Sequence, residues 1–131
     1  MFMVSKPQRF DVIVASNLFG DIITDLGAVL QGGMGFAAGA NLNPEKEFPS
    51  MFEPIHGSAL DIAGKGVVNP LASIESARMM LEHFGEDQAA VALLEAEQAV
   101  LIEGKVRTRD MGGSSSTQEM GDAVRAALMA Q

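Results

Sequence analysis

The chain has 131 residues, with 9 Lys and Arg against 17 Asp and Glu, a net charge of −8 and 47% hydrophobic residues. This is enough chain for one modest packed domain, and its acidity without a basic cluster argues against nucleic acid or an anionic membrane surface as a partner. The absence of cysteine excludes disulfides and thiolate metal sites, and no apolar run approaches the roughly 20 residues that span a bilayer. We therefore expect a cytoplasmic protein that binds neither nucleic acid nor membrane.

The first elements in chain order are a predicted strand and a predicted helix. Residues 10–15 are apolar and rich in β-branched side chains, which is typical of a strand buried on both faces. Asn17 is a suitable N-cap for a helix over residues 18–30, which ends before a Gly-Gly pair. Its expected apolar face consists of Ile22, Leu26 and Val29.

Residues 32–70 are crowded with Gly, Pro, Asn and Ser. This composition predicts loops joined by brief strands within residues 34–40 and 51–55. Long loops in a compact enzyme usually carry function.

The last third of the chain is predicted to be mainly helical. A helix over residues 71–84 ends at a glycine, and a second over residues 87–103 ends at another. Residues 105–109 are compatible with a short strand, and Ser116 with Glu119 forms a capping box for a helix that runs to about residue 130. One apolar stripe of the second of these helices is expected to contain Ala89, Leu93, Ala96 and Val100.

Asp21 and Asp25 are four residues apart on the first predicted helix, so their carboxylates project from the same side. Adjacent carboxylates repel each other unless a cation lies between them, and Mg²⁺ or Mn²⁺ prefers oxygen ligands. The pair is a candidate metal site. Two solvated acids on an exposed helix face are the alternative.

A second group of candidate residues lies in the loop around His56. Small residues at Gly57, Ser58 and Ala59 leave backbone N–H groups free to approach a ligand, and the imidazole can bind a base or a ribose. Asp61 can accept a hydrogen bond from a ribose hydroxyl and would repel a 2′-phosphate. A structural hydrogen bond or simple exposure of the histidine is the alternative.

Five motifs follow one another along the chain: Phe-Asp-Val-Ile-Val at 10–14, Asn-Leu-Phe-Gly-Asp-Ile-Ile-Thr-Asp-Leu-Gly-Ala at 17–28, Glu-Pro-Ile-His-Gly-Ser-Ala at 53–59, Asp-Ile-Ala-Gly-Lys-Gly at 61–66 and Asn-Pro at 69–70. In this order they resemble the motifs of the β-decarboxylating dehydrogenases, the family that includes isopropylmalate, isocitrate, D-malate and tartrate dehydrogenases. The resemblance covers nearly the whole chain, to the closing residues 119–124, and residues 40–53 are most similar to the tartrate and D-malate branch.

The resemblance implies an α/β fold that is isopropylmalate-dehydrogenase-like, of which this chain is the C-terminal portion only. Residues 1–37 would end the smaller, dimer-forming and metal-binding domain, and residues 38–131 would form the C-terminal half of the nucleotide-binding domain. Family members have a catalytic tyrosine and lysine before the matched region, so we expect no catalytic residue of that kind here. The chain contains no tyrosine.

The resemblance also implies a function and its site residues. Asp21 and Asp25 would ligate Mg²⁺ or Mn²⁺, which chelates a 2-hydroxy acid such as tartrate or D-malate during NAD-dependent oxidation, with or without decarboxylation. Glu53 would lie near the nicotinamide, and Asp61 would select NAD over NADP. Leu60 stands where the family usually has proline. The expected contacts with adenosine and phosphates are His56, Gly57, Ser58, Ala59, Ile62 and Asn69.

Two other functions compete with this interpretation. The chain could be a catalytically inactive binding or oligomerising module, and in either case we expect a homodimer. A metal-dependent phosphate enzyme using Asp21 and Asp25 is the weaker alternative, because the sequence has no Walker-type glycine loop.

Overall fold

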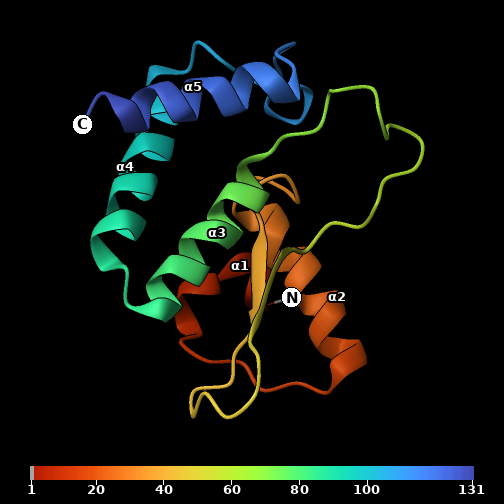
Figure 1. Ribbon diagram of the computed structural model, residues 1–131. Coiled ribbons are helices and arrows are strands. Elements are labelled where there is room, and N and C mark those ends of the chain that lie inside the picture. Colours follow the sequence, from red (N-terminus) through yellow and green to blue (C-terminus); the bar gives the residue numbers. More distant parts are fainter. Residues whose placement is uncertain (1) are drawn as a thin grey trace.

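The computed structural model describes residues 2–131. A two-stranded antiparallel ribbon lies at its centre, and helices surround it (Figure 1). The elements in chain order are α1 (Phe2–Ser5), η1 (Pro7–Arg9), α2 (Asn17–Leu30), β1 (Ala38–Asn41), β2 (Met51–Pro54), α3 (Leu71–Phe84), α4 (Asp87–Glu103), η2 (Arg109–Met111) and α5 (Thr117–Met129).

The ribbon and α3 form the central unit. Ala38 pairs with Pro54 and Asn41 with Met51 in the antiparallel register, so both predicted brief strands exist. The first extends one residue beyond its predicted range, to Asn41, and the second lies within its predicted range. Helix α3 packs against both strands, α4 packs against α3, and α5 packs against α4. In Figure 1, α5 crosses the top of the molecule above α3 and α4.

The hydrophobic core lies among α3, α4 and α5. Its buried members come from all three helices, and Phe36 and Leu93 are among the half-buried side chains that pack around them. Met120 has no exposed surface and is the largest fully buried apolar side chain among residues 2–131. The buried cluster consists of Leu71, Ala96, Val100, Met120 and Val124.

The ends of the C-terminal helices follow local sequence signals and confirm the prediction. Gly85 and Gly104 adopt left-handed conformations with φ of +83° and +66°, which glycine accepts without a steric cost. At the start of α5, the Glu119 side chain accepts from the Ser116 N–H at 2.7 Å, and Ser116 Oγ accepts from the Glu119 N–H at 3.2 Å. The hydrogen bonds that the Glu119 carboxylate accepts from the Ser116 N–H and from the Ser116 hydroxyl, the latter at 2.8 Å, lower the pKa of that carboxylate. No helix in residues 2–131 has both the length and the apolar character needed to cross a membrane.

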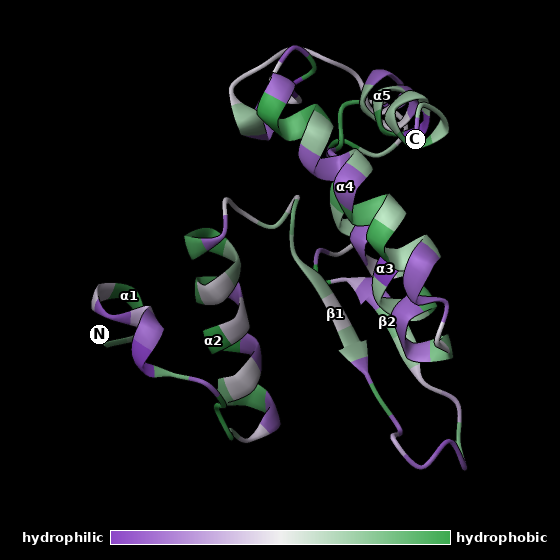
Figure 2. Ribbon diagram, turned by 90° about the vertical axis from the view of Figure 1, so that its left-hand side faces the viewer, coloured by the Kyte–Doolittle hydropathy of each residue, from purple (hydrophilic) through white to green (hydrophobic). Residues whose placement is uncertain are grey.

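The N-terminal segment differs from the prediction. Residues 10–15 form no strand and pair with no other described segment, and Val14 is 94% exposed. A β-branched run becomes a strand only when a neighbouring strand satisfies its backbone groups, and the part of the chain described supplies no such neighbour. Figure 2 shows α1 and α2 on one side of β1, with α3, α4 and α5 on the other.

Helix α2 also corrects the prediction in two respects. It begins at Asn17, so Ser16 occupies the N-cap position, and it has no side-chain cap. Ile22, Leu26 and Val29, expected to face a core, are exposed, because α2 packs mainly on the short helix α1.

Two smaller expectations were wrong. Residues 105–109 form no strand; Thr108 is fully buried there and η2 follows it. On α4, Ala90 rather than Ala89 is buried, whereas Leu93, Ala96 and Val100 belong to the core as predicted.

Truncation of the core methionine tests the packing. We expect Met120→Ala to lower the free energy of unfolding by about 2–5 kcal/mol, because it removes buried methylenes and leaves a cavity. The matched control is Met129→Ala on the same helix, where the side chain is 81% exposed and the expected change is within about 0.5 kcal/mol. Urea unfolding of both variants measures the difference, and equal effects would contradict the assigned core.

Candidate functional site

A cleft of about 440 Å³ separates α2 from the ribbon. It contains both predicted metal ligands, Asp21 and Asp25, and it also contains Glu53 of β2. The remaining residues that line it are Leu18, Ile22, Thr24, Gly39, Ala40, Asn41 and Ile55.

Local structure explains how the three acids reach the same cleft. Asp21 and Asp25 lie one turn apart on α2, which directs both carboxylates to one side. Glu53 pairs with Gly39 across the ribbon, and a Cβ at Gly39 would lie 3.2 Å from Cγ2 of Ile55, which also lines the cleft.

The donor set of the cleft suits a hard divalent cation. Neither Asp21 nor Asp25 forms an ion pair with any residue from 2 to 131, and carboxylate oxygen is the ligand type preferred by Mg²⁺ and Mn²⁺. Within the same residues no three acidic or histidine side chains lie close enough to hold an ion together. The pair therefore fits part of a coordination sphere and leaves the other positions open.

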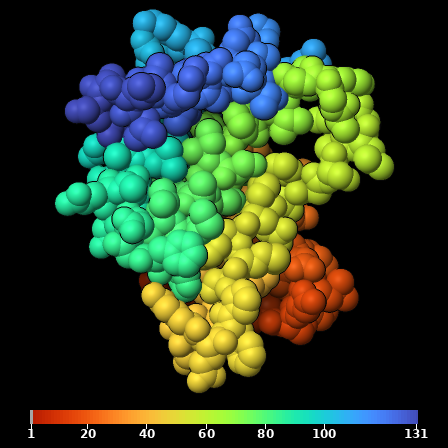
Figure 3. All heavy atoms as spheres, in the orientation of Figure 1, coloured from red at the N-terminus to blue at the C-terminus, as the bar shows by residue number. Residues whose placement is uncertain are grey.

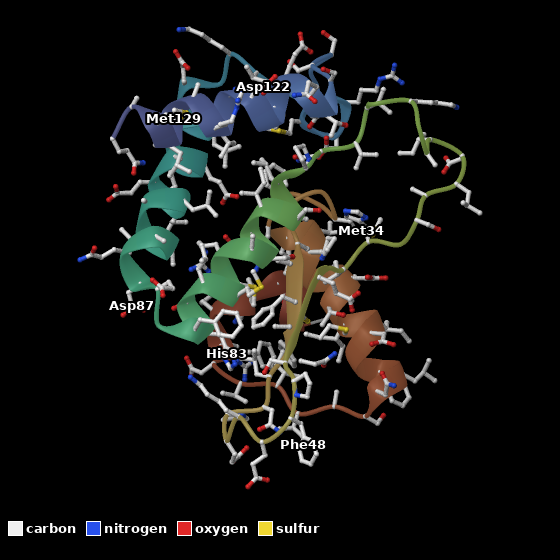
Figure 4. All side chains as sticks on the ribbon, viewed as in Figure 1. Met34, Phe48, His83, Asp87, Asp122 and Met129 are labelled. Carbon is white, nitrogen blue, oxygen red and sulfur yellow. The ribbon has the colours of Figure 1, made fainter. Side chains whose placement is uncertain are left out.

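A second groove, of about 380 Å³, lies along the loop that follows β2. It contains five of the residues predicted to contact a nucleotide, whereas Ser58 and Asp61 are not among the residues that line it. Figure 4 shows Met34, another lining residue, beside this loop. The predicted residues in the groove are His56, Gly57, Ala59, Ile62 and Asn69.

His56 offers an unused hydrogen-bonding atom to this groove. Its Nδ1 lies 3.1 Å from the Gly57 carbonyl oxygen, and a donated hydrogen bond there makes Nε2 an acceptor. Nε2 is buried and has no partner in residues 2–131. A buried acceptor without a donor is costly, so this atom is suited to a ligand hydroxyl or amino group.

Asn69 is 3% exposed, and structural hydrogen bonds use both ends of its amide. Its Oδ1 accepts from the Leu71 N–H at 3.0 Å at the start of α3, and its Nδ2 donates to Asp110 Oδ2 at 2.9 Å. Asp110 Oδ1 in turn accepts from Thr108 Oγ1 at 2.5 Å. Asn69 therefore forms one wall of the groove and holds that wall in place.

Two residues that were not predicted from the sequence, Arg109 and Asp110, also line the groove. Asp110 and Asn69 are 41 residues apart, so no local spacing joins them. The only signal in the sequence is a polar Thr-Arg-Asp run at residues 108–110, which Met111 separates from the pair Gly112 and Gly113.

The loop that follows β2 contains a local turn at Ala59, and hydrogen bonds to α5 hold its C-terminal end. Ala59 adopts a left-handed φ of +44°, and its carbonyl accepts from the N–H of Ile62 at 2.9 Å. Thr117 of α5 donates from its N–H to Gly66 and from its hydroxyl to Val68. Leu60 is exposed, and the loop forms the right-hand edge of the molecule in Figure 3.

His83, interpreted from sequence as a helix-end residue, lies outside both sites. It is in the last turn of α3, with Nε2 3.3 Å from Ser50 Oγ and its ring beside Phe52 and Phe84. Through these contacts His83 links the loop between β1 and β2 to α3.

The sequence profile of the isocitrate/isopropylmalate dehydrogenase family matches residues 1–124. The chain belongs to this family. It is 51% identical over 123 residues to a probable tartrate dehydrogenase/decarboxylase of Bacillus subtilis (strain 168), covering 94% of this chain and 34% of that protein. It is 54% identical over 124 residues to the 3-isopropylmalate dehydrogenase of Thermobifida fusca (strain YX), covering 95% and 34%. The chain thus spans about a third of the length of these relatives.

Solved structures agree with the family assignment and with the predicted fold class. The isocitrate dehydrogenase of Methylococcus capsulatus superposes with a TM-score of 0.90 at 46% identity, over 98% of this chain and 38% of that one. A β-decarboxylating dehydrogenase of Thermococcus kodakarensis gives 0.84 at 34% identity, over 98% and 37%. The fold is therefore part of the α/β isopropylmalate-dehydrogenase-like architecture.

Removal of the Asp110 carboxylate tests the structural role of the Asn69 network. We expect Asp110→Ala to destabilise the fold by about 1–3 kcal/mol, because it leaves buried donors of Asn69 and Thr108 without an acceptor. Asp110→Asn, which keeps one carbonyl acceptor, should cost less, and Asp11→Ala at an exposed site should cost little. Thermal unfolding measures all three, and an Asp110→Ala variant as stable as Asp11→Ala would refute the role.

Proposed function

We propose that this chain supplies the metal-binding and nucleotide-binding surfaces of a dehydrogenase that oxidises a 2-hydroxy acid with NAD and Mg²⁺ or Mn²⁺. The observation that carries the proposal is the placement of Asp21, Asp25 and Glu53 in one cleft, with His56 only three residues beyond Glu53 in the adjoining groove. In this proposal residues 1–37 belong to the metal-binding domain and residues 38–131 to the nucleotide-binding domain.

In the cleft, Asp21 and Asp25 would hold the divalent ion through their carboxylate oxygens. A divalent ion bound there supplies Lewis-acid polarisation of the hydroxyl and carboxylate of the substrate. Glu53 lies across the cleft from α2 and would border the nicotinamide. The two aspartates would fix the metal and Glu53 would border the nicotinamide, so that the metal and the reacting carbon lie at one end of the cofactor.

In the groove, the Nε2 acceptor of His56 would receive a hydrogen bond from the adenosine part of NAD. Gly57 has no side-chain or backbone atom within contact distance of where a Cβ would be, so the backbone there is open to a ligand. Ser58 and Asp61 follow on the exposed side of the same loop. Asp61 would accept from a ribose hydroxyl and repel a 2′-phosphate, which favours NAD over NADP.

The substrate class follows from relatives of two kinds. Proteins named for tartrate and for isopropylmalate are about equally identical to this chain, and both names denote dehydrogenases that act on 2-hydroxy acids. The likeness of residues 40–53 to the tartrate and D-malate branch favours tartrate or D-malate as the substrate.

A second candidate, a binding or oligomerising module, is favoured by exposed apolar surface. Val12, Val14, Leu18, Phe19 and Val29 are all exposed on the N-terminal segment and α2, and surface of this kind marks interaction sites. Pairing of these surfaces in a homodimer would bury them in either function. Sedimentation should show a dimer, and a well-folded monomer at high concentration would argue against it.

Manganese binding tests the metal site. We expect the chain to bind Mn²⁺ in calorimetry and expect Asp21→Asn and Asp25→Asn each to weaken binding at least about tenfold, since each removes a charged ligand from the cleft. Asp11→Asn, at an exposed position outside the cleft, is the control. Equal affinity in all three variants would contradict the assignment.

Nucleotide binding and turnover are tested together. We expect NAD to bind more tightly than NADP. We also expect His56→Ala but not His83→Ala to weaken the binding of NAD, because only His56 lines the groove.

Because the chain contains no tyrosine, the 131 residues alone should show negligible oxidation of D-malate with NAD and Mn²⁺. Turnover typical of dehydrogenases, about 1–1000 per second, would overturn the view that the proton donor lies elsewhere.

A further inference from the structure

A third groove, of about 340 Å³, is lined in large part by α3 and α4 and shares no lining residue with the nucleotide groove. Residues of α3, α4, β1 and the preceding turn line it, and no residue of β2 does. Five of the residues that line it are apolar: Phe36, Ala38, Leu71, Met79 and Leu101. The polar side chains in it are Gln31, Glu75 and Glu97.

Glu97 of α4 is the unusual member of this groove. The residue is 7% exposed, and its Oε1 is buried with no hydrogen-bond partner in residues 2–131. No ion pair to Glu97 exists within the same residues. A carboxyl group buried without a donor or counter-charge is strongly disfavoured, so this group calls for a partner.

The other acid of the groove already has its counter-charge. Arg78 donates to Glu75 through two parallel hydrogen bonds, each 2.7 Å, and also to Glu82 at 3.0 Å. The bidentate geometry fixes the guanidinium on Glu75. Glu97 therefore remains the one acid lining this groove, within the described chain, that has no cation paired with it.

We propose that this groove binds a cationic head group on an apolar stem, the chemistry shared by a free alkylammonium ion and a lysine side chain. The carboxylate of Glu97 would receive the ammonium, and the stem would lie against Phe36, Met79 and Leu101. The site is distinct from the metal cleft and the nucleotide groove, so it stands or falls independently of the proposed function.

The titration of Glu97 gives the site a pH signature. Burial, with a smaller contribution from Glu75 and an opposing one from Arg78, raises the pKa of Glu97 to about 7. These two residues of α3 are the charged groups acting on it in the described chain. A cation requires the ionised carboxylate, so its affinity should fall about tenfold for each pH unit below 7.

The pKa also fixes the pH dependence of stability. The folded chain holds the Glu97 proton more tightly than the unfolded chain, whose carboxyl has its ordinary value of 4.5. The stabilising contribution of the neutral acid is therefore fully present below pH 4.5 and is lost as the pH rises to about 7. We expect Glu97→Gln to remove this decline in chemical unfolding, and an unchanged decline in the variant would contradict the assigned pKa.

Binding is tested on the full chain by NMR titration with n-butylammonium at pH 8. We expect the amide signals of Phe36, Glu97 and Leu101 to shift, with no comparable shift for 1-butanol, which matches the stem without the charge. Titration with N-acetyl-lysine N-methylamide separates the sources: affinity at least about tenfold higher than for n-butylammonium assigns the site to a polypeptide side chain, and equal affinity assigns it to a free amine.

Variants at two positions of α4 complete the test. Glu97→Gln and Glu97→Leu remove a buried charge and should fold at least as well as the parent, yet lose at least about nine-tenths of the affinity for n-butylammonium. Glu95→Gln, at an exposed position of the same helix, should bind as the parent does. Equal binding of 1-butanol, retained affinity in Glu97→Gln, or no shift with either amine would each overturn the proposal.

Discussion

The buried amide of Asn69 is the constraint on which the arrangement of the metal cleft and the nucleotide groove depends. Its two ends join the first turn of α3 to Asp110, while Ala72 of the same turn donates its N–H to the Gly35 carbonyl at 3.0 Å. A side chain at Gly35 would lie 2.4 Å from Asp110 Oδ2, so glycine is required by this close approach. The start of α3, the turn before β1 and the η2 segment are thereby fixed relative to one another.

Chain continuity then couples the two sites. Glu53 of β2 lines the metal cleft, and His56, two residues after the end of β2, lines the nucleotide groove. The pairing register of the two strands fixes the position of Glu53. The loop that carries His56 is fixed by the turn at Ala59 and by the hydrogen bonds that Thr117 donates to it. A cofactor that spans cleft and groove would therefore meet a metal at one end and the loop at the other. The α2 wall is supported less firmly, because α2 packs mainly on α1.

The sequence predicted those features that neighbouring residues determine. Gly85, Gly104 and the Ser116–Glu119 box end or begin helices through their own backbone and side-chain bonds, and Asp21 and Asp25 share a cleft because helical spacing requires it. The strand predicted at residues 10–15 failed, because a strand depends on a partner that residues 2–131 do not provide. Asp110 and Glu97 could not be found from sequence, since their importance comes from contacts or burial created by the folded chain.

The most direct test of the account is where Mn²⁺ broadens the NMR spectrum of this chain. The paramagnetic ion at a low molar ratio is predicted to broaden first the amide signals of Asp21, Asp25, Gly39 and Glu53, and to leave α5 unchanged. Glu75 and Glu82 are paired with Arg78, and Asp122 is paired with Arg125 and accepts a hydrogen bond from Gln118, which makes these acids poor competitors. Broadening centred on α3 or α5, with the α2 and β2 signals intact, would contradict the central claim.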